Sequence, residues 1–109
     1  MKNISKEDGF NVTLPMLVEG NEVFGKKFKE KTFLIYISHY GASFWLKTSV
    51  SLGSELKLII NLPPKLAEEK NLKLIINGEV VFIETSKEQN LKKRISCRFK
   101  NKYIIKSDE

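Results

Sequence analysis

Residues 36–46 read Tyr-Ile-Ser-His-Tyr-Gly-Ala-Ser-Phe-Trp-Leu, and this segment decides the fold class of the chain. It begins with the end of an apolar, β-branched and aromatic stretch, and a short polar turn then runs from Ser38 to Gly41. After the turn, Ala42, Phe44 and Leu46 occupy every second position, which is the period of a half-buried strand. The segment therefore predicts two strands joined by a turn.

The same strand signals continue on both sides of this segment, and no sustained helical periodicity occurs. We expect six strands, over residues 11–18, 30–37, 42–47, 55–62, 72–84 and 94–99. Pro15 suits a bent or edge strand, Gly20 begins a predicted turn, and Gly78 indicates a bulge or bend. Residues 65–71 have room for at most one helical turn. The chain is therefore predicted to be all-β, a six-stranded antiparallel β-barrel with little helix.

Length and composition limit the chain to one soluble domain. Its 109 residues are 41% hydrophobic and 29% charged, as in ordinary globular proteins. We expect an N-terminal arm over residues 1–10, the barrel over 11–102 and a C-terminal tail over 103–109. The arm carries no apolar stretch of signal-peptide length, and no apolar run reaches the roughly 18–20 residues of a membrane span. With a single cysteine, Cys97, a cytoplasmic location is predicted.

One feature departs from the inward and outward alternation. Ile59, Ile75, Val81 and Ile83 fall on the outward phase of neighbouring strands, where water would meet them. We expect the tail at 103–105 to fold back over these side chains, and a second copy of the chain is the alternative cover. The protein is accordingly expected to be a monomer or a homodimer.

The residue sets that catalysis requires are missing from the sequence. His39 is the only histidine and Cys97 the only cysteine, so one chain cannot assemble a histidine-pair or thiolate metal site. The nucleophile turn G-x-S-x-G and the phosphate-binding patterns G-x-x-x-x-G-K-[ST] and G-x-G-x-x-G are also missing. Cys97 lies on the inward phase of its strand, which is typical of a core residue. We therefore expect a binding protein that is not an enzyme and that has no metal or cofactor.

The net charge of +6 favours an anionic partner. The predicted basic face consists of Lys26, Lys27, Lys29, Arg94 and Arg98. These residues belong to two clusters in the sequence, one around Lys26 to Lys29 and one around Arg94 to Arg98. If the two clusters meet on one side of the barrel, with Phe28 or Trp45 exposed between them, the face would resemble a platform for single-stranded nucleic acid. The two arginines lie about 13 Å apart along one strand, so they form a stripe and not a single phosphate clamp. The alternative interpretation is that these two arginines simply face water on an exposed strand and bind no ligand.

The turn at 38–41 and the strands around it resemble the PilZ domain, a bacterial six-stranded barrel that binds cyclic di-GMP. That family carries D/N-x-S-x-x-G in this turn, where Ser38 and Gly41 match and Tyr36 replaces the acid or amide. It also carries R-x-x-x-R just before the first strand, where this chain has Lys6 and Phe10. The resemblance covers nearly the whole chain.

This resemblance implies a signalling or adaptor module in cyclic di-GMP-linked regulation. Because the motifs are incomplete, we predict action through a protein partner, with weak or absent standard binding of cyclic di-GMP. A small basic barrel that binds RNA or single-stranded DNA is the alternative. The predicted ligand-binding residues are Lys6, Phe10, Tyr36, Ser38, His39, Gly41 and Trp45. Trp45 falls on the outward phase and is the predicted main contact, although packing under the N-terminal arm would also explain it.

Overall fold

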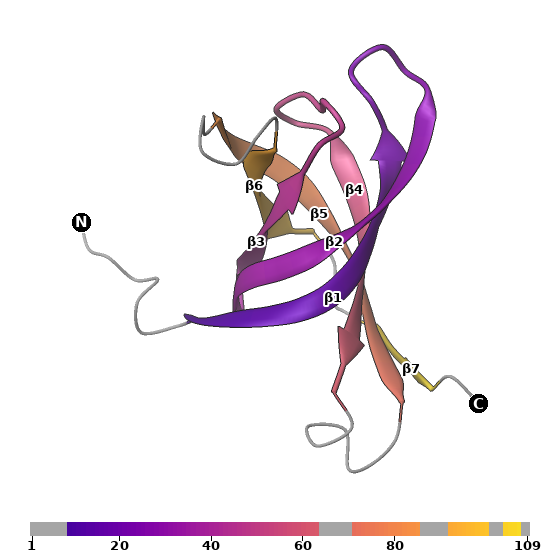
Figure 1. The fold of residues 1–109 in the computed structure, drawn as a ribbon, viewed down its shortest axis with the longest axis vertical. Coiled ribbons are helices and arrows are strands. Elements are labelled where there is room, and N and C mark those ends of the chain that lie inside the picture. Colours follow the sequence, from indigo (N-terminus) through magenta and orange to yellow (C-terminus); the bar gives the residue numbers. More distant parts are fainter. Residues whose placement is uncertain (1–8, 64–70, 86–91, 101–103, 108–109) are drawn as a thin grey trace.

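The computed structural model describes residues 9–63, 71–85, 92–100 and 104–107, and every regular element in this part of the chain is a strand (Figure 1). The strands are β1 (Gly9–Asn21), β2 (Lys27–Ser38), β3 (Gly41–Leu46), β4 (Glu55–Leu62), β5 (Leu72–Thr85), β6 (Lys93–Phe99) and β7 (Ile104–Ser107).

Six of these strands close into a barrel. The order is β4-β1-β2-β3-β6-β5, and β5 pairs again with β4, so each of the six strands has two neighbours. Every pairing is antiparallel. This ring confirms the predicted fold class, a PilZ-like six-stranded antiparallel barrel, to which β7 is added as an extra strand.

The core lies inside the ring and is built from alternate residues of the strands. Its largest fully buried side chains are Phe44, Leu34, Leu46, Leu56, Leu58, Ile60, Ile95, Val18 and Val80. Each such side chain stabilises the fold by roughly 1.5–3 kcal/mol relative to an exposed position. Cys97 belongs to the same core, as its phase predicted, and burial raises the pKa of its thiol to about 12.

The β1–β2 hairpin is longer than the sequence predicted. Its turn spans Glu22 to Lys26 and not 20–22, with a hydrogen bond from Glu22 N–H to the Lys26 carbonyl oxygen of 2.8 Å. Gly25 takes the positive φ of 96° that the turn requires. Gly20 stays within β1 because a Cβ there would lie 2.5 Å from Leu56 Cδ2, so the glycine leaves room for a core side chain.

Four hydrogen bonds fix the loop between β3 and β4 against this hairpin. The Glu30 carboxylate accepts hydrogen bonds from Lys47 N–H at 2.8 Å, from Thr48 N–H at 3.0 Å and from the Thr48 hydroxyl at 2.7 Å. Val23 N–H donates to the Ser49 carbonyl oxygen at 2.9 Å. The hairpin and the loop are therefore joined at one end of the barrel.

The bulge in β5 lies later than predicted. Gly78 pairs regularly with Phe99, and the register shifts between Val80 and Phe82. The shift reverses the alternation, so Phe82 points outward and is 53% exposed, whereas Ile83 packs against the core. The expected outward position of Ile83 is therefore wrong. Gly78 serves a different purpose, because a Cβ there would lie 2.9 Å from Cys97 Cβ in β6.

The C-terminal segment does not cover the outer apolar side chains. Residues 104–107 form β7, which pairs edge to edge with Leu72–Ile75 of β5. The predicted cover is wrong for these residues because the segment lengthens the sheet, and Ile104 is itself 58% exposed. Tyr103 and the predicted helical turn, apart from Asn71, lie outside the described residues.

Candidate functional site

The turn between β2 and β3 uses both of its motif residues to hold its own backbone. The Ser38 hydroxyl oxygen accepts hydrogen bonds from Tyr40 N–H at 3.1 Å and from Gly41 N–H at 3.3 Å. A Cβ on Gly41 would collide with the Cys97 carbonyl oxygen of β6, so only glycine allows β3 and β6 to pair at this point. The match to the PilZ motif at these two positions therefore has a structural explanation in this chain.

Tyr36 occupies the space beside the start of β1. It faces Asn11 across the β1–β2 pairing and Ser43 across the β2–β3 pairing. A Cβ on Gly9 would lie 2.5 Å from Tyr36 Cζ, so the ring packs directly over that glycine. A phenol ring thus stands where the resembled family has a short acid or amide.

The other predicted ligand-binding residues are only partly brought together. Phe10 lies opposite Ile37 beside the turn and is 61% exposed, and Lys6 lies outside the described residues. The exposed rings of His39 and Tyr40 meet edge to face, with centroids 6.5 Å apart. Trp45 is half-buried and lies four residues along β3 from Gly41, which is about 13 Å.

The two predicted basic clusters have different neighbours. Lys29 of β2 faces Glu19 of β1, whereas Arg98 of β6 pairs with Glu79 of β5 at 3.3 Å. β3 separates the two clusters in the strand order. Phe28 packs partly against the core and also lines a groove with Lys27 and Lys29, so its ring is only partly exposed.

A second surface was only partly visible in the sequence. On the outside of the barrel, Leu17, Ile59, Ile75 and Ile104 are successive cross-strand neighbours on β1, β4, β5 and β7. We call these four side chains the apolar row. The outward positions of Ile59 and Ile75 were predicted from the alternation along their strands. Leu17 and Ile104 join them only through the strand register.

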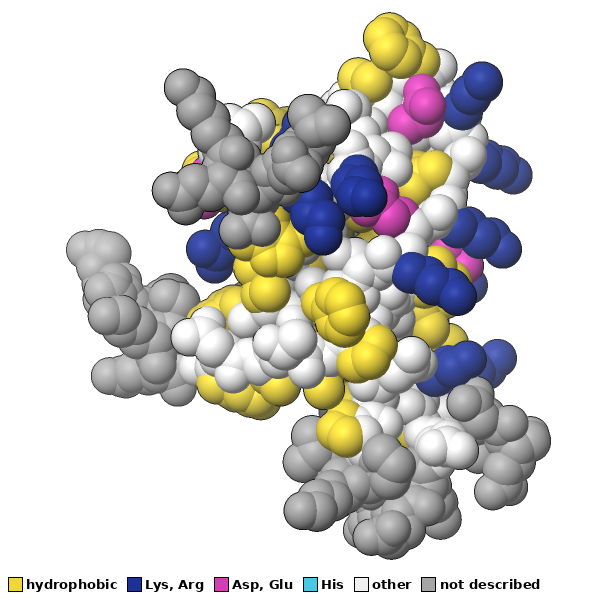
Figure 2. Space-filling view, in the orientation of Figure 1, with side chains coloured by type: hydrophobic (Ala, Val, Ile, Leu, Met, Phe, Trp, Pro, Cys, Tyr) yellow, Lys and Arg dark blue, Asp and Glu magenta, His cyan; other side chains and the backbone are white. Residues whose placement is uncertain are grey.

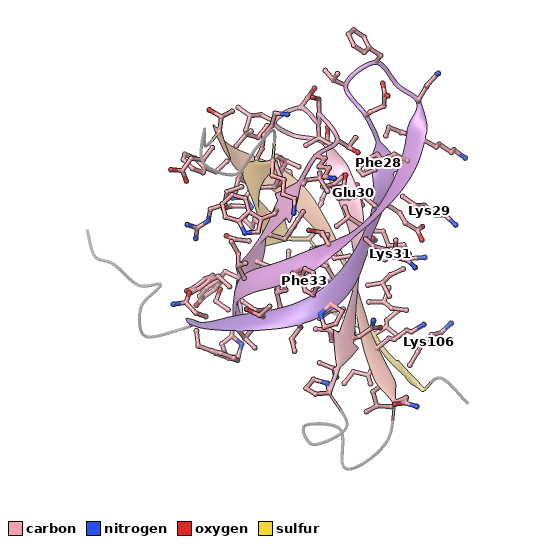
Figure 3. All side chains as sticks on the ribbon, in the orientation of Figure 1. Phe28, Lys29, Glu30, Lys31, Phe33 and Lys106 are labelled. Carbon is pink, nitrogen blue, oxygen red and sulfur yellow. The ribbon has the colours of Figure 1, made fainter. Side chains whose placement is uncertain are left out.

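Lysines surround the apolar row. Lys31 faces Leu17 at its β2 end. Of the next outward positions along the strands, four are lysines and three others are Glu19, Asn61 and Asn77. We call the set the lysine rim, which comprises Lys29, Lys31, Lys57, Lys73 and Lys106. Figure 2 shows Lys and Arg side chains gathered along one border of the molecule. Figure 3 shows Lys29, Lys31 and Lys106 projecting from that same side.

A groove opens beside the lysine rim, where β1 and β4 separate beyond the pair formed by Glu19 and Lys57. Its volume is ≈ 510 Å³. Its lining includes Gly20, Phe28 and Asn77, three lysines and two glutamates, namely Lys27, Lys29, Lys57, Glu19 and Glu55. The groove therefore extends from the lysine rim toward the hairpin tip and carries charges of both signs.

Within the described residues, no three His, Cys, Asp or Glu side chains gather in a way that could hold a metal ion. The same part of the chain contains no helix with the length and hydropathy of a membrane span.

The sequence matches no protein-family model and no curated protein sequence. Among solved structures, the chain is similar to the Bacillus subtilis inhibitor of motility MotI/DgrA, with a TM-score of 0.67 and 21% identity. The similarity covers 86% of this chain but 41% of that one, so this chain spans less than half of its neighbour's length. At this identity the similarity establishes the shared fold.

Proposed function

We propose, from the barrel that this chain shares with PilZ-like proteins, that it is a non-catalytic regulatory domain that acts by binding a protein partner. We further propose that standard binding of cyclic di-GMP at the β2–β3 turn is weak or absent. The observation that carries the proposal is the packing of the Tyr36 ring over Gly9, at the motif position where the resembled family has Asp or Asn.

The chemistry of the turn supports weak nucleotide binding. The Ser38 hydroxyl oxygen already accepts hydrogen bonds from two backbone N–H groups, so its lone pairs are occupied within the turn. Lys6 and Phe10 stand at the two arginine positions of the family motif. A guanidinium fork binds phosphate with two parallel hydrogen bonds and stacks on a base, and neither lysine nor phenylalanine combines those properties.

The structural neighbour supports a regulatory role. MotI/DgrA is described as an inhibitor of motility, which is a protein that modulates another process. Because the two proteins share the barrel, we infer that this chain also serves regulation and that its exposed surfaces carry the contacts.

Titration of the whole chain with cyclic di-GMP by isothermal calorimetry tests the proposal. We expect no heat of binding for the unmodified protein at about 100 μM ligand, which corresponds to a free energy of binding weaker than about −5.5 kcal/mol. The triple variant Lys6→Arg, Phe10→Arg, Tyr36→Asn restores the family pattern and is expected to gain binding. Micromolar binding by the unmodified protein that Ser38→Ala abolishes, with the barrel still folded by circular dichroism, would refute the proposal.

A further inference from the structure

The apolar row has a regular geometry. Its four side chains lie on four successive strands, so neighbours are about 4.8 Å apart in the direction across the strands. An α-helix lying across the strands presents one side chain per turn of 5.4 Å on a single face. The spacing of the row therefore matches the apolar stripe of a short amphipathic helix.

The charges beside the row are arranged in two lines. Lys29 and Lys57 flank it on one side, and Lys73 and Lys106 flank it on the other. On β4 these two lines are four residues apart, which is about 13 Å, and a helix with its side chains is about 10–12 Å wide. A helix over the row would therefore have lysines along both of its flanks.

This face has a marked excess of positive charge. Among the described residues of these rows, the lysine rim contributes five lysines and Glu19 is the one acid, so their formal charge is +4. One row further along, Glu55 pairs with Lys100 at 3.7 Å and Glu79 pairs with Arg98 at 3.3 Å. Those two acids are thus directed toward cations of the β6 side.

The charge also indicates what does not cover the row. A second copy of this chain that used the same face would place lysine rim against lysine rim, and like charges in contact oppose association. β7 lies beside β5 and supplies Ile104 to the row instead of covering it. The occupant therefore has to carry negative charge on both sides of an apolar stripe.

We propose that the outer face of β1, β4, β5 and β7 is a docking surface for an acidic amphipathic helix of a partner protein. This inference rests on the proposed function, because it names the surface through which the domain would bind its partner. The row is entirely aliphatic, whereas single-stranded nucleic acid is held by aromatic rings on which the bases stack. An aliphatic stripe between two lines of cations favours a protein helix.

A synthetic peptide probes this surface directly. We would use a fluorescein-labelled peptide of about 14 residues, with leucine at helix spacing i, i+3, i+7 and i+10 and glutamate on both flanks. A second peptide of the same composition, with its leucines redistributed around the helix, is the control. Fluorescence anisotropy with the full chain at about 50 mM salt is expected to show at least about tenfold tighter binding of the first peptide.

Matched variants of the protein locate the site. Ile59→Thr keeps a β-branched residue in the row and is expected to weaken peptide binding about fivefold, whereas Val81→Thr, at an exposed position outside the row, leaves it within about twofold. Lys57→Gln with Lys106→Gln is expected to weaken binding about fivefold. Lys47→Gln with Arg94→Gln removes the same charge elsewhere and is expected to have less than a twofold effect.

Three results would overturn the inference. The first is equal binding of the two peptides, and the second is equal weakening by the variants inside and outside the face. The third is tighter binding of a 20-nucleotide single-stranded RNA or of phosphatidylserine vesicles than of the peptide, with the same sensitivity to Lys57 and Lys106. Each result is separate from the calorimetric test, because cyclic di-GMP binding at Ser38 would refute the proposed function and leave peptide binding at the row unchanged.

Discussion

The replacement of Gly41 by alanine should destabilise the barrel, although it adds one methyl group. A Cβ at this position falls well inside 3.0 Å of the Cys97 carbonyl oxygen, a separation that real Cβ atoms essentially never show, and lies 3.2 Å from the Cys97 carbonyl carbon. Both contacts are backbone atoms of β6, so no side chain can rotate away and β3 must shift. Overpacking of this kind costs about 1–3 kcal/mol.

Thermal unfolding followed by circular dichroism measures this cost. For a domain of about 100 residues, 1–3 kcal/mol lowers the Tm by roughly 4–12 °C. Gly53→Asn is the matched control, because Gly53 has a φ of 89°, which Asn tolerates, and open space around its Cβ position. A Tm for Gly41→Ala within about 2 °C of the unmodified protein would show that the close approach of β3 to β6 is not a constraint.

Three other perturbations test the packing of the barrel. Phe44→Ala removes a side chain with 0% exposure and should lower the free energy of unfolding by about 3–5 kcal/mol in urea titrations, and a loss below 1 kcal/mol would contradict its central position. Glu30→Ala removes three hydrogen bonds to the β3–β4 loop and should cost about 2 kcal/mol, with faster amide exchange at Lys47 and Thr48; unchanged exchange there would argue against the tie. Burial raises the pKa of the Cys97 thiol from 9.0 to about 12, so between these pH values the folded state holds a proton that the unfolded state has lost. The resulting stabilisation is present below pH 9.0 and declines above it by up to about 1.4 kcal/mol per pH unit, and Cys97→Ala should remove this part of the slope in urea titrations at pH 8, 9 and 10.

The sequence predicted the ring of strands because alternation is a local signal. The predicted strand at 55–62 coincides with β4, and the one at 72–84 ends one residue before the end of β5. The errors arose where local signals conflict with packing. Gly20 looked like a turn residue, but its missing side chain makes room for Leu56. The bulge after Val80 reversed the sides of the sheet that Phe82 and Ile83 face, and no residue type at that point predicts a bulge.

The candidate site was less accessible to sequence reasoning because it depends on which residues face one another across strands. Ser38 and Gly41 could be found by their motif, yet the motif could not show that both serve the backbone of the turn. Leu17 and Ile104 are 87 positions apart in the sequence, and only the shared register with Ile59 and Ile75 aligns them. A pattern built from four strands cannot be recognised in any one of them.

β7 lies outside the closed ring, since β4 and β5 complete the barrel without it. This short strand nevertheless contributes Ile104 and Lys106 to the outer face. We therefore expect substitutions at the outward-facing positions of β7 to leave the closed ring of six strands intact, because none of its pairings involves β7. If the proposed docking surface is correct, changes at Ile104 and Lys106 alter what the face binds while the ring of strands stays the same.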